Sequence, residues 1–266
     1  MGERSLVGVI LAGHSPQEDD PLAAYTQGHS KALIPIAGRP MIAYVVDALE
    51  RSRYIRQIVV IGLPPEEHDL LPPAIDHLPD QGSLFANAQA GVRYALSLPA
   101  ATDGVLVSSS DVPLITAEIV DRFIETCLET DDDFYYGIIE RSVMEGRFPT
   151  SRRTYVRLLD GEFAGGDVSL VRSDIVADPA LWERVAAARK SPLKQARLVG
   201  GIGPLFKLLL HRLSLAEAER IAERTFNIRG RVVVCADAEL GMDIDKPFQL
   251  EIARAELEAR QGGATC

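Results

Sequence analysis

The chain has 266 residues, of which 47% are hydrophobic and 25% are charged, and its formal net charge is −10. This composition is typical of a globular protein and unlike that of a disordered chain. The acidic balance argues against a general nucleic-acid-binding protein. No apolar run reaches the roughly 20 residues that a membrane-spanning helix needs, and we expect no signal peptide.

The three cysteines, Cys127, Cys235 and Cys266, lack the spacing of a metal site and favour a reducing compartment, so we expect a cytoplasmic protein. Charge is unevenly distributed, because residues 141–212 carry thirteen Lys/Arg against seven Asp/Glu. A basic middle region in an acidic chain suggests a site for a phosphorylated partner. Basic side chains that only solvate helices are the simpler explanation.

The first half of the chain alternates apolar runs that predict strands with amphipathic stretches that predict helices. The predicted strands are Leu6–Leu11, Gln57–Gly62 and Gly104–Ser110, and the predicted helices cover residues 38–52, 83–99 and 116–129. This alternation predicts parallel strands joined by right-handed crossovers, and therefore a Rossmann-like α/β fold. Ligands of such sheets bind beyond the carboxyl ends of the strands, where Gly13 and Asp111 would lie.

The second half is less regular. Strands are predicted at residues 133–141, 154–163 and 165–175, with Asp160-Gly161 as a hairpin turn. A helical insertion is expected at about 179–223, in which Ser214 and Glu217 have the spacing of a capping box. A last strand at 231–236 and a helix at 246–261 complete a mixed, mostly parallel sheet with helices on both faces.

The turn Leu11-Ala12-Gly13 follows the first predicted strand. Its backbone amides can bind phosphate groups, and Lys31, a short way further on, supplies positive charge. A glycine after a strand is often only a turn, so this signal is weak by itself.

A second segment, "DQGSLFANAQAG", places the small residues Gly82 and Ser83 ahead of a helix that carries Asn87. An Asn side chain can donate and accept hydrogen bonds at once, which suits the edge of a nucleobase. An ordinary helix start is the alternative explanation.

Carboxylates end two further predicted strands. Asp111 lies in "SSSDVPL", and Asp243 and Asp245 lie in "GMDIDKP". Mg²⁺ prefers oxygen ligands and keeps several waters, so Asp111 and one of the other two carboxylates can form a metal site. A role in capping the following helix is the alternative for each.

The motifs LAG…KALIPIAGRPMI, DQGSLFANAQAG, SSDVPL and DIDKPFQLEIAR occur in this order, and together they resemble the MobA-like nucleotidyltransferases, which have a GT-A fold. The resemblance covers residues 6–125 and 231–256. It implies one domain over 1–266, with a nucleotide-binding half (1–130), an acceptor-side half (131–230) that holds the helical and hairpin insertion, and a closing strand and helix (231–266).

The resemblance implies transfer of a nucleoside monophosphate from an NTP, with CTP or GTP favoured, to a small phosphorylated acceptor with release of pyrophosphate. Mg²⁺ is the implied cofactor, held by Asp111 and Asp245, with Asp243 as the second choice. Lys31 and Asp111 are the implied catalytic residues. The implied nucleotide-binding residues are Leu11, Ala12, Gly13, His14, Lys31, Gly82, Ser83 and Asn87.

The loop after Gly13 departs from the family pattern. It is longer, it carries Glu18, Asp19 and Asp20, and His14 stands in place of a second glycine. No arginine lies between Gly13 and Lys31, and Arg39 is the candidate to replace it.

The acceptor-side half holds candidate phosphate ligands in Arg147, Arg152 and Arg153, because arginine forms bidentate bonds with phosphate. A basic hairpin in solvent is an equally good interpretation. The apolar stretch 203–213 predicts a helix packed in the core or at a homodimer interface. The alternative is that residues 190–213 cover an apolar acceptor or contact an anionic membrane surface.

Two other functions stay open. A GT-A glycosyltransferase that uses a sugar nucleotide would normally carry Asp-x-Asp, whereas Ser109 stands at the first position of this motif here. A degenerate nucleotide-binding or scaffold protein is favoured by the altered loop and disfavoured by the presence of Lys31, Asp111 and Asp245.

Overall fold

The computed structural model describes residues 4–13, 20–98, 103–172 and 210–263. Its large sheet is made of β1 (Leu6–Leu11), β4 (Ile55–Ile61), β5 (Asp76–Leu78), β6 (Gly104–Ser109), β7 (Phe134–Glu140), β8 (Val156–Leu158), β9 (Gly161–Val171) and β10 (Gly230–Cys235). A small hairpin consists of β2 (Pro35–Ile36) and β3 (Arg39–Pro40).

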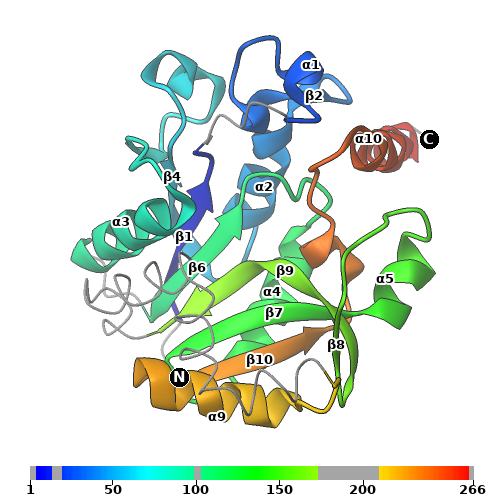
Figure 1. Cartoon of the computed structure of the whole chain (residues 1–266). Helices are drawn as coiled ribbons and strands as arrows, with labels where there is room; N and C mark the ends of the chain where they lie inside the picture. The colour runs from blue at the N-terminus through cyan, green and yellow to red at the C-terminus, as the bar shows by residue number, and fades with distance from the viewer. Residues whose placement is uncertain (1–3, 14–19, 99–102, 173–209, 264–266) are drawn as a thin grey trace.

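The helices are α1 (Ala23–Thr26), α2 (Met41–Glu50), α3 (Leu84–Ser97), α4 (Ala117–Cys127), α5 (Arg141–Arg147), α9 (Leu215–Phe226) and α10 (Pro247–Gly263). Three short 3₁₀ helices are η1 (Lys31–Leu33), η2 (Pro65–Leu70) and η4 (Ala238–Gly241). Figure 1 shows α3 in front of the sheet, α2 and α4 behind it, and α9 below β10.

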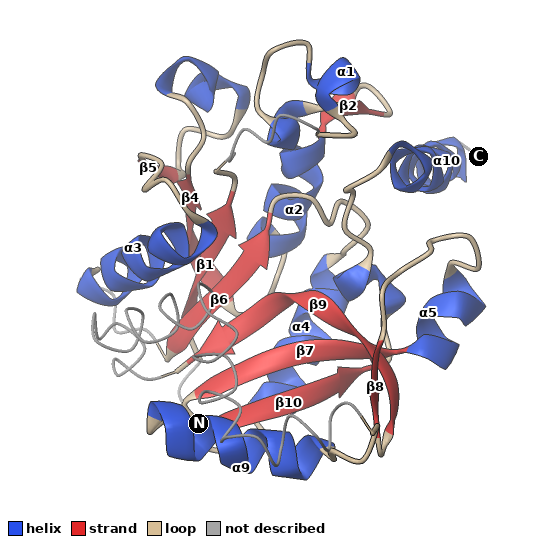
Figure 2. Ribbon diagram, in the orientation of Figure 1, coloured by secondary structure: helices blue, strands red, loops and turns tan. Residues whose placement is uncertain are grey.

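The large sheet has the order β10-β7-β9-β6-β1-β4-β5, with β8 paired to β9 (Figure 2). The pairs within β5-β4-β1-β6 are parallel, as is the pair of β7 and β10, whereas β9 runs antiparallel to β6, β7 and β8. The prediction of a mixed, mostly parallel α/β sheet with helices on both faces is confirmed.

The apolar side chains of β1 contribute to two hydrophobic cores, because successive side chains of a strand point to opposite faces of the sheet. Leu6 and Ile10 join the large core with α2, α4 and α10, whereas Val7 and Val9 pack with Val92 of α3 on the other face. Burial on both faces explains why the run is continuously apolar instead of alternating.

Strand order reverses direction at β1. The chain passes from β1 to β4 and β5 on one side, and then returns to place β6 on the other side of β1. Open α/β sheets bind ligands at such a switch point, beyond the carboxyl ends of the strands. The end of β1 at Leu11 therefore lies where the fold favours a binding site.

Local signals for helix starts agree with the structure. The Oγ1 of Thr116 accepts a hydrogen bond from the backbone of Ile119 (3.4 Å), and the Oγ of Ser214 accepts one from Glu217 (3.2 Å). The predicted strand 133–141 is one residue too long at each end, since β7 begins at Phe134 and Arg141 begins α5, a helix that was not predicted. Residues 179–209 of the predicted helical insertion lie outside the described residues.

Within the described residues, no helix has both the length and the apolar character that a bilayer crossing requires. Membrane contact was the alternative interpretation for residues 190–213. Residues 190–209 of this segment lie outside the described part of the chain.

Candidate functional site

A cavity of about 540 Å³ opens at the carboxyl ends of β1 and β6. The ends of the strands are tied together, because the amide of Ala12 donates to the carbonyl of Ile61 and the amide of Ser110 donates to that of Leu11. We call this space the nucleotide cavity, after the ligand that the motif resemblance implies. Its lining includes the predicted residues Leu11, Ala12, Gly13, Lys31, Ser83, Asn87, Asp111 and Asp245, together with Asp20, Asp80 and Asp167.

Lys31 is the centre of the polar contacts in this cavity. Its Nζ lies 2.7 Å from Asp111 Oδ2 and 2.7 Å from Asp245 Oδ1. Lys31 and Asp111 are largely buried, whereas the Asp245 side chain is 58% exposed. Three residues from three distant parts of the chain therefore meet at one point.

Neighbouring hydrogen bonds hold each member of this cluster in place. Ser30 caps η1 and its Oγ donates to the carbonyl of Ala12, which fixes Lys31 beside the end of β1. The amide of Ile244 donates to the carbonyl of Asp111 (2.9 Å), and the amide of Asp245 donates to the buried Gln249 side chain (2.9 Å).

Electrostatics keep Lys31 charged. Burial opposes the positive charge, but Asp111 and Asp245 outweigh this effect and raise the pKa of Lys31 above its ordinary value. The ammonium group is therefore protonated at neutral pH, and it can meet an anionic ligand as a point charge.

The floor of the cavity is tightly packed around Gly13. A Cβ atom at Gly13 would lie 2.2 Å from the Nδ2 atom of Asn87, and one at Gly62, whose φ is +94°, would lie 2.3 Å from the Gly13 Cα. The contact at Gly62 is with backbone and excludes a side chain there, whereas a side chain at Gly13 would require Asn87 to move.

Asn87 is buried and already bonded within the protein. Its Nδ2 donates to Asp80 (2.8 Å), and its Oδ1 accepts from the amide of Gln81 (2.7 Å). Gly82, with φ +79°, follows this turn, and its amide donates to Asp80. Asn87 thus positions the loop at residues 80–82, while Ser83 caps α3 and lines the cavity.

A second ionic cluster lies beside the first and includes a residue that the sequence analysis missed. The Arg153 guanidinium contacts the Asp243 carboxylate, and its Nη2 lies 3.9 Å from Asp167 Oδ2. Burial and the nearby Asp111 raise the pKa of Asp167, and Arg153 partly opposes this rise. The sequence offers one local signal for Asp167, namely the two glycines that precede it. The side chains around Asp167 come from distant segments, so no local pattern connects them with it.

None of the predicted arginines is among the residues that line the nucleotide cavity. Arg147 is paired with Glu239 (3.1 Å) and Glu256, and Arg152 lies over the Phe248 ring at 5.4 Å. Arg39 forms a bidentate pair with Asp47 (2.8 and 3.0 Å), so the structure gives no support for Arg39 as the replacement arginine. His14, like Glu18 and Asp19, lies outside the described residues.

The carboxylates fit a Mg²⁺ ion that a nucleotide brings with it. Among the described residues, no three or more His, Cys, Asp or Glu side chains form a group that could hold a metal ion. Magnesium in phosphate-transfer sites usually uses one or two carboxylates and completes its shell with waters and substrate phosphates. The Lys31 ammonium donates to both Asp111 and Asp245. The two carboxylates are therefore close enough to bind one cation together.

A family model described as the MobA-like NTP transferase domain matches residues 8–197 of the chain. Among solved structures, a hypothetical transferase from Thermus thermophilus is 35% identical, with a TM-score of 0.77 over 92% of this chain and 99% of that one.

Two curated relatives match shorter regions. The bifunctional protein GlmU of Rhodospirillum rubrum is 39% identical over 106 residues, which are 38% of this chain and 23% of GlmU. A probable molybdenum cofactor guanylyltransferase of Thermococcus kodakarensis is 28% identical over 45% of this chain and 53% of the relative. The chain thus matches about a quarter to a half of the length of these relatives.

Proposed function

Because the chain belongs to the family of MobA-like NTP transferases, we propose that it transfers a nucleoside monophosphate from an NTP to a small phosphorylated acceptor and releases pyrophosphate. The observation that carries this proposal is the meeting of Lys31, Asp111 and Asp245 at the switch point of the sheet. A charged lysine between two carboxylates suits a triphosphate and its metal ion.

In this proposal the triphosphate lies over the backbone of Leu11, Ala12 and Gly13. Lys31 leaves one of its carboxylates and pairs with the triphosphate, whose charge it stabilises as the leaving group departs. Gly82 and Ser83 flank the base and ribose, and Asn87 keeps their loop in position. His14 is proposed to contact the same nucleotide.

Asp111 and Asp245 would hold the Mg²⁺ ion, with Asp243 as the second choice for Asp245. When bound, the ion neutralises phosphate charge and orients the α-phosphate for in-line attack. The acceptor phosphate is already anionic at neutral pH, so the reaction needs no general base. The task of the protein is positioning and charge neutralisation.

The identity of the base and of the acceptor is part of the proposal. CTP or GTP is favoured, and a probable guanylyltransferase among the relatives supports GTP. Arg152 is proposed to face the acceptor, whereas Arg147 and Arg153 would each need to leave their carboxylate partners to do so. A homodimer and a cytoplasmic location remain predictions from the sequence.

The test combines ligand screening with a catalytic variant. Thermal unfolding is measured with each of four NTPs and with sugar nucleotides, with and without Mg²⁺, because a bound ligand raises the unfolding temperature. We expect stabilisation by one NTP in the presence of Mg²⁺. Stabilisation by a sugar nucleotide alone would instead indicate a glycosyltransferase, and no stabilisation by any of them would favour a scaffold protein.

Pyrophosphate release is then measured with the NTP that binds and a panel of phosphorylated acceptors. Asp111→Asn is expected to lower kcat/KM by about 1000-fold, as for loss of a group that stabilises the transition state. Asp69→Asn changes an exposed carboxylate of η2 and serves as the matched control. Equal rates for the two variants would refute the proposed role of Asp111.

A further inference from the structure

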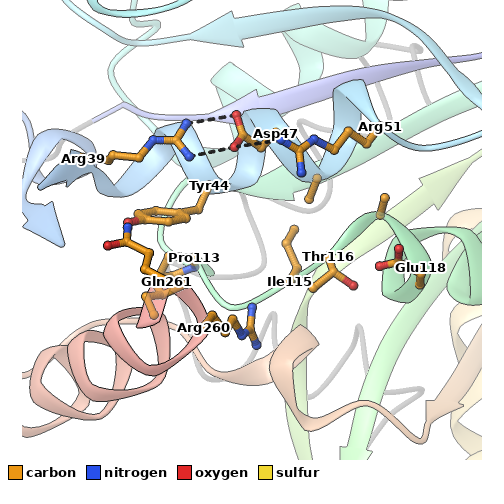
Figure 3. Close-up of a pocket in the computed structure, with 13 residues that line it drawn as sticks. Arg39, Tyr44, Asp47, Arg51, Pro113, Ile115, Thr116, Glu118, Arg260 and Gln261 are labelled. Atoms are coloured by element: carbon orange, nitrogen blue, oxygen red, sulfur yellow. Dashed lines mark hydrogen bonds and ion pairs between the residues drawn. The ribbon is translucent and has the colours of Figure 1, made fainter. Parts of the chain in front are cut away.

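A second cavity, of about 480 Å³, lies behind the segment that follows Asp111 (Figure 3). We call it the rear cavity. It is enclosed by α2, by residues 113–118 and by the last turns of α10, and it shares no lining residue with the nucleotide cavity. Nothing in the proposed transfer reaction uses this space.

The floor of the rear cavity is apolar and well ordered by packing. Ala48, Ile115 and Leu257 line it and are each less than 5% exposed. The Tyr44 ring forms part of the wall, and its hydroxyl donates to the carbonyl of Ile36 (2.8 Å), which fixes the ring. A concave apolar surface of this volume is typical of small-molecule sites.

Charged side chains surround this floor, with the row Arg39, Asp47 and Arg51 on one wall and Arg260 across from it (Figure 3). Arg39 and Asp47 satisfy each other through a bidentate pair. Glu118 contributes the remaining negative charge. The five groups together leave one positive charge.

Two of the arginines have capacity for a ligand. The Arg51 side chain is 78% exposed, and its Nη2 lies 4.0 Å from Asp47, beyond hydrogen-bond distance. Arg260 donates one hydrogen bond, from Nη1 to the carbonyl of Leu114 (3.1 Å), and a guanidinium has five N–H donors. Planar guanidinium groups bind carboxylate and phosphate oxygens well.

We propose that the rear cavity binds a small molecule with one oxyanion group and an apolar body. The oxyanion, a carboxylate or a phosphate, is held by Arg51 and Arg260, and the apolar body lies on Ile115, Leu257 and the Tyr44 ring. This site is separate from the one for the nucleotide, although its wall begins at Pro113, two residues after Asp111.

The test uses benzoate and phenyl phosphate as probes, with benzyl alcohol as their neutral analogue, and binding is measured by titration calorimetry on the full chain. We expect at least one anion to bind in a 1:1 complex and benzyl alcohol to bind about tenfold more weakly or not at all. Binding of benzoate alone would identify a carboxylate site, and binding of phenyl phosphate alone a phosphate site. No binding of either anion at about 10 mM would overturn the proposal.

Variants assign the binding to the rear cavity. The double change Arg51→Gln/Arg260→Gln is expected to weaken anion binding about tenfold or more, since it removes both guanidinium groups that would hold the anion. The control, Arg220→Gln/Arg224→Gln, removes the same charge from the exposed surface of α9 and should leave binding unchanged.

A third variant, Ala117→Leu, adds bulk to the wall of the cavity without changing charge, and it should also weaken binding. Unaltered binding in both the double variant and Ala117→Leu would refute the proposal. Equal weakening in the α9 control would also refute it, because overall charge would then explain the affinity.

Discussion

Asp243 and Asp245 lie two residues apart in one segment, yet they belong to ionic clusters of different character. Asp245 is 58% exposed and shares Lys31 with Asp111 at the mouth of the nucleotide cavity. Asp243 is 13% exposed and contacts Arg153, whose side chain is 14% exposed. The two carboxylates stand in one short segment, and their environments in the fold are different.

The difference in burial predicts a difference in role. A buried ion pair cannot exchange its partner cheaply, because each charge left alone in the interior carries a large desolvation cost. A partly exposed pair can exchange its partner, since water solvates the groups while they move. The Lys31–Asp245 pair is therefore suited to ligand binding, and the Arg153 cluster to holding β9 and the segment at Asp243 together.

Arg153→Met tests the structural side of this comparison and has the largest expected effect. Removing the guanidinium leaves Asp243 buried without a cation, which should lower the free energy of unfolding by about 3–5 kcal/mol. Urea denaturation measures this change. If Arg153 instead acts on the acceptor, the variant keeps its stability and shows a raised KM for the acceptor.

Arg152→Met is the matched control for this experiment. Arg152 is exposed and contacts the Phe248 ring, so its loss should change the unfolding free energy by less than about 1 kcal/mol. An equal loss of stability in both variants would show that burial does not separate the two arginines.

The paired variants Asp245→Asn and Asp243→Asn test the functional side. If Asp245 holds the metal ion, Asp245→Asn should lower kcat/KM for pyrophosphate release by about 100-fold while the unfolding free energy changes little. Asp243→Asn should have the opposite pattern, with lower stability and a smaller loss of activity. A reversed pattern would make Asp243 the metal ligand.

Lys31→Met tests the Lys31 cluster through the pH dependence of the unfolding free energy. The pKa of Lys31 is raised in the folded protein above its ordinary value of 10.5, so its ion pairs stabilise the fold below that pH. This stabilisation is lost as the pH rises further, through the raised folded value. We expect the variant to be about 2 kcal/mol less stable between about pH 7 and pH 9, and the difference from the wild type to shrink above pH 10.5.

The exposed neighbour Lys246 provides the control for the alkaline titration. Lys246→Met should give only a small difference in unfolding free energy, because this side chain lies in an exposed residue. A constant difference for Lys31→Met at all values of pH would show that its ion pairs contribute nothing to stability.

The parallel part of the fold could be predicted from the sequence because its signals are local. The strands β1, β4 and β6 each contain a short apolar run, and the residues that follow the strands must lie at one edge of a parallel sheet. This reasoning alone places Gly13 and Asp111 in one site. The motif resemblance added Lys31 and the preference for Asp245.

The antiparallel part could not be predicted in the same way. The position of β9 between β6 and β7 depends on pairing between strands that are distant in the sequence. The alternation of apolar and polar residues predicts a strand but does not identify its partner. The burial of Asp167 depends on Arg153 and on the end of β6 together. The pairing of Arg147 with Glu256 joins residues 109 positions apart, so a cation that looked available for an acceptor is already bonded.

Glu256→Gln, the change with the smallest expected effect, tests this third pair. Arg147 lowers the pKa of Glu256 below its ordinary value of 4.5, so the pair stabilises the fold above that pH and the effect is lost as the pH falls through the lowered value. Both side chains are partly exposed, so the loss at neutral pH should stay below about 1 kcal/mol. Glu258→Gln, on the same helix, is the control in urea denaturation.

Activity gives an independent measurement, because Glu256→Gln frees Arg147 from this ion pair. A lower KM for the acceptor would support Arg147 as a phosphate ligand. An unchanged KM is expected if Arg147 only connects α5 to α10.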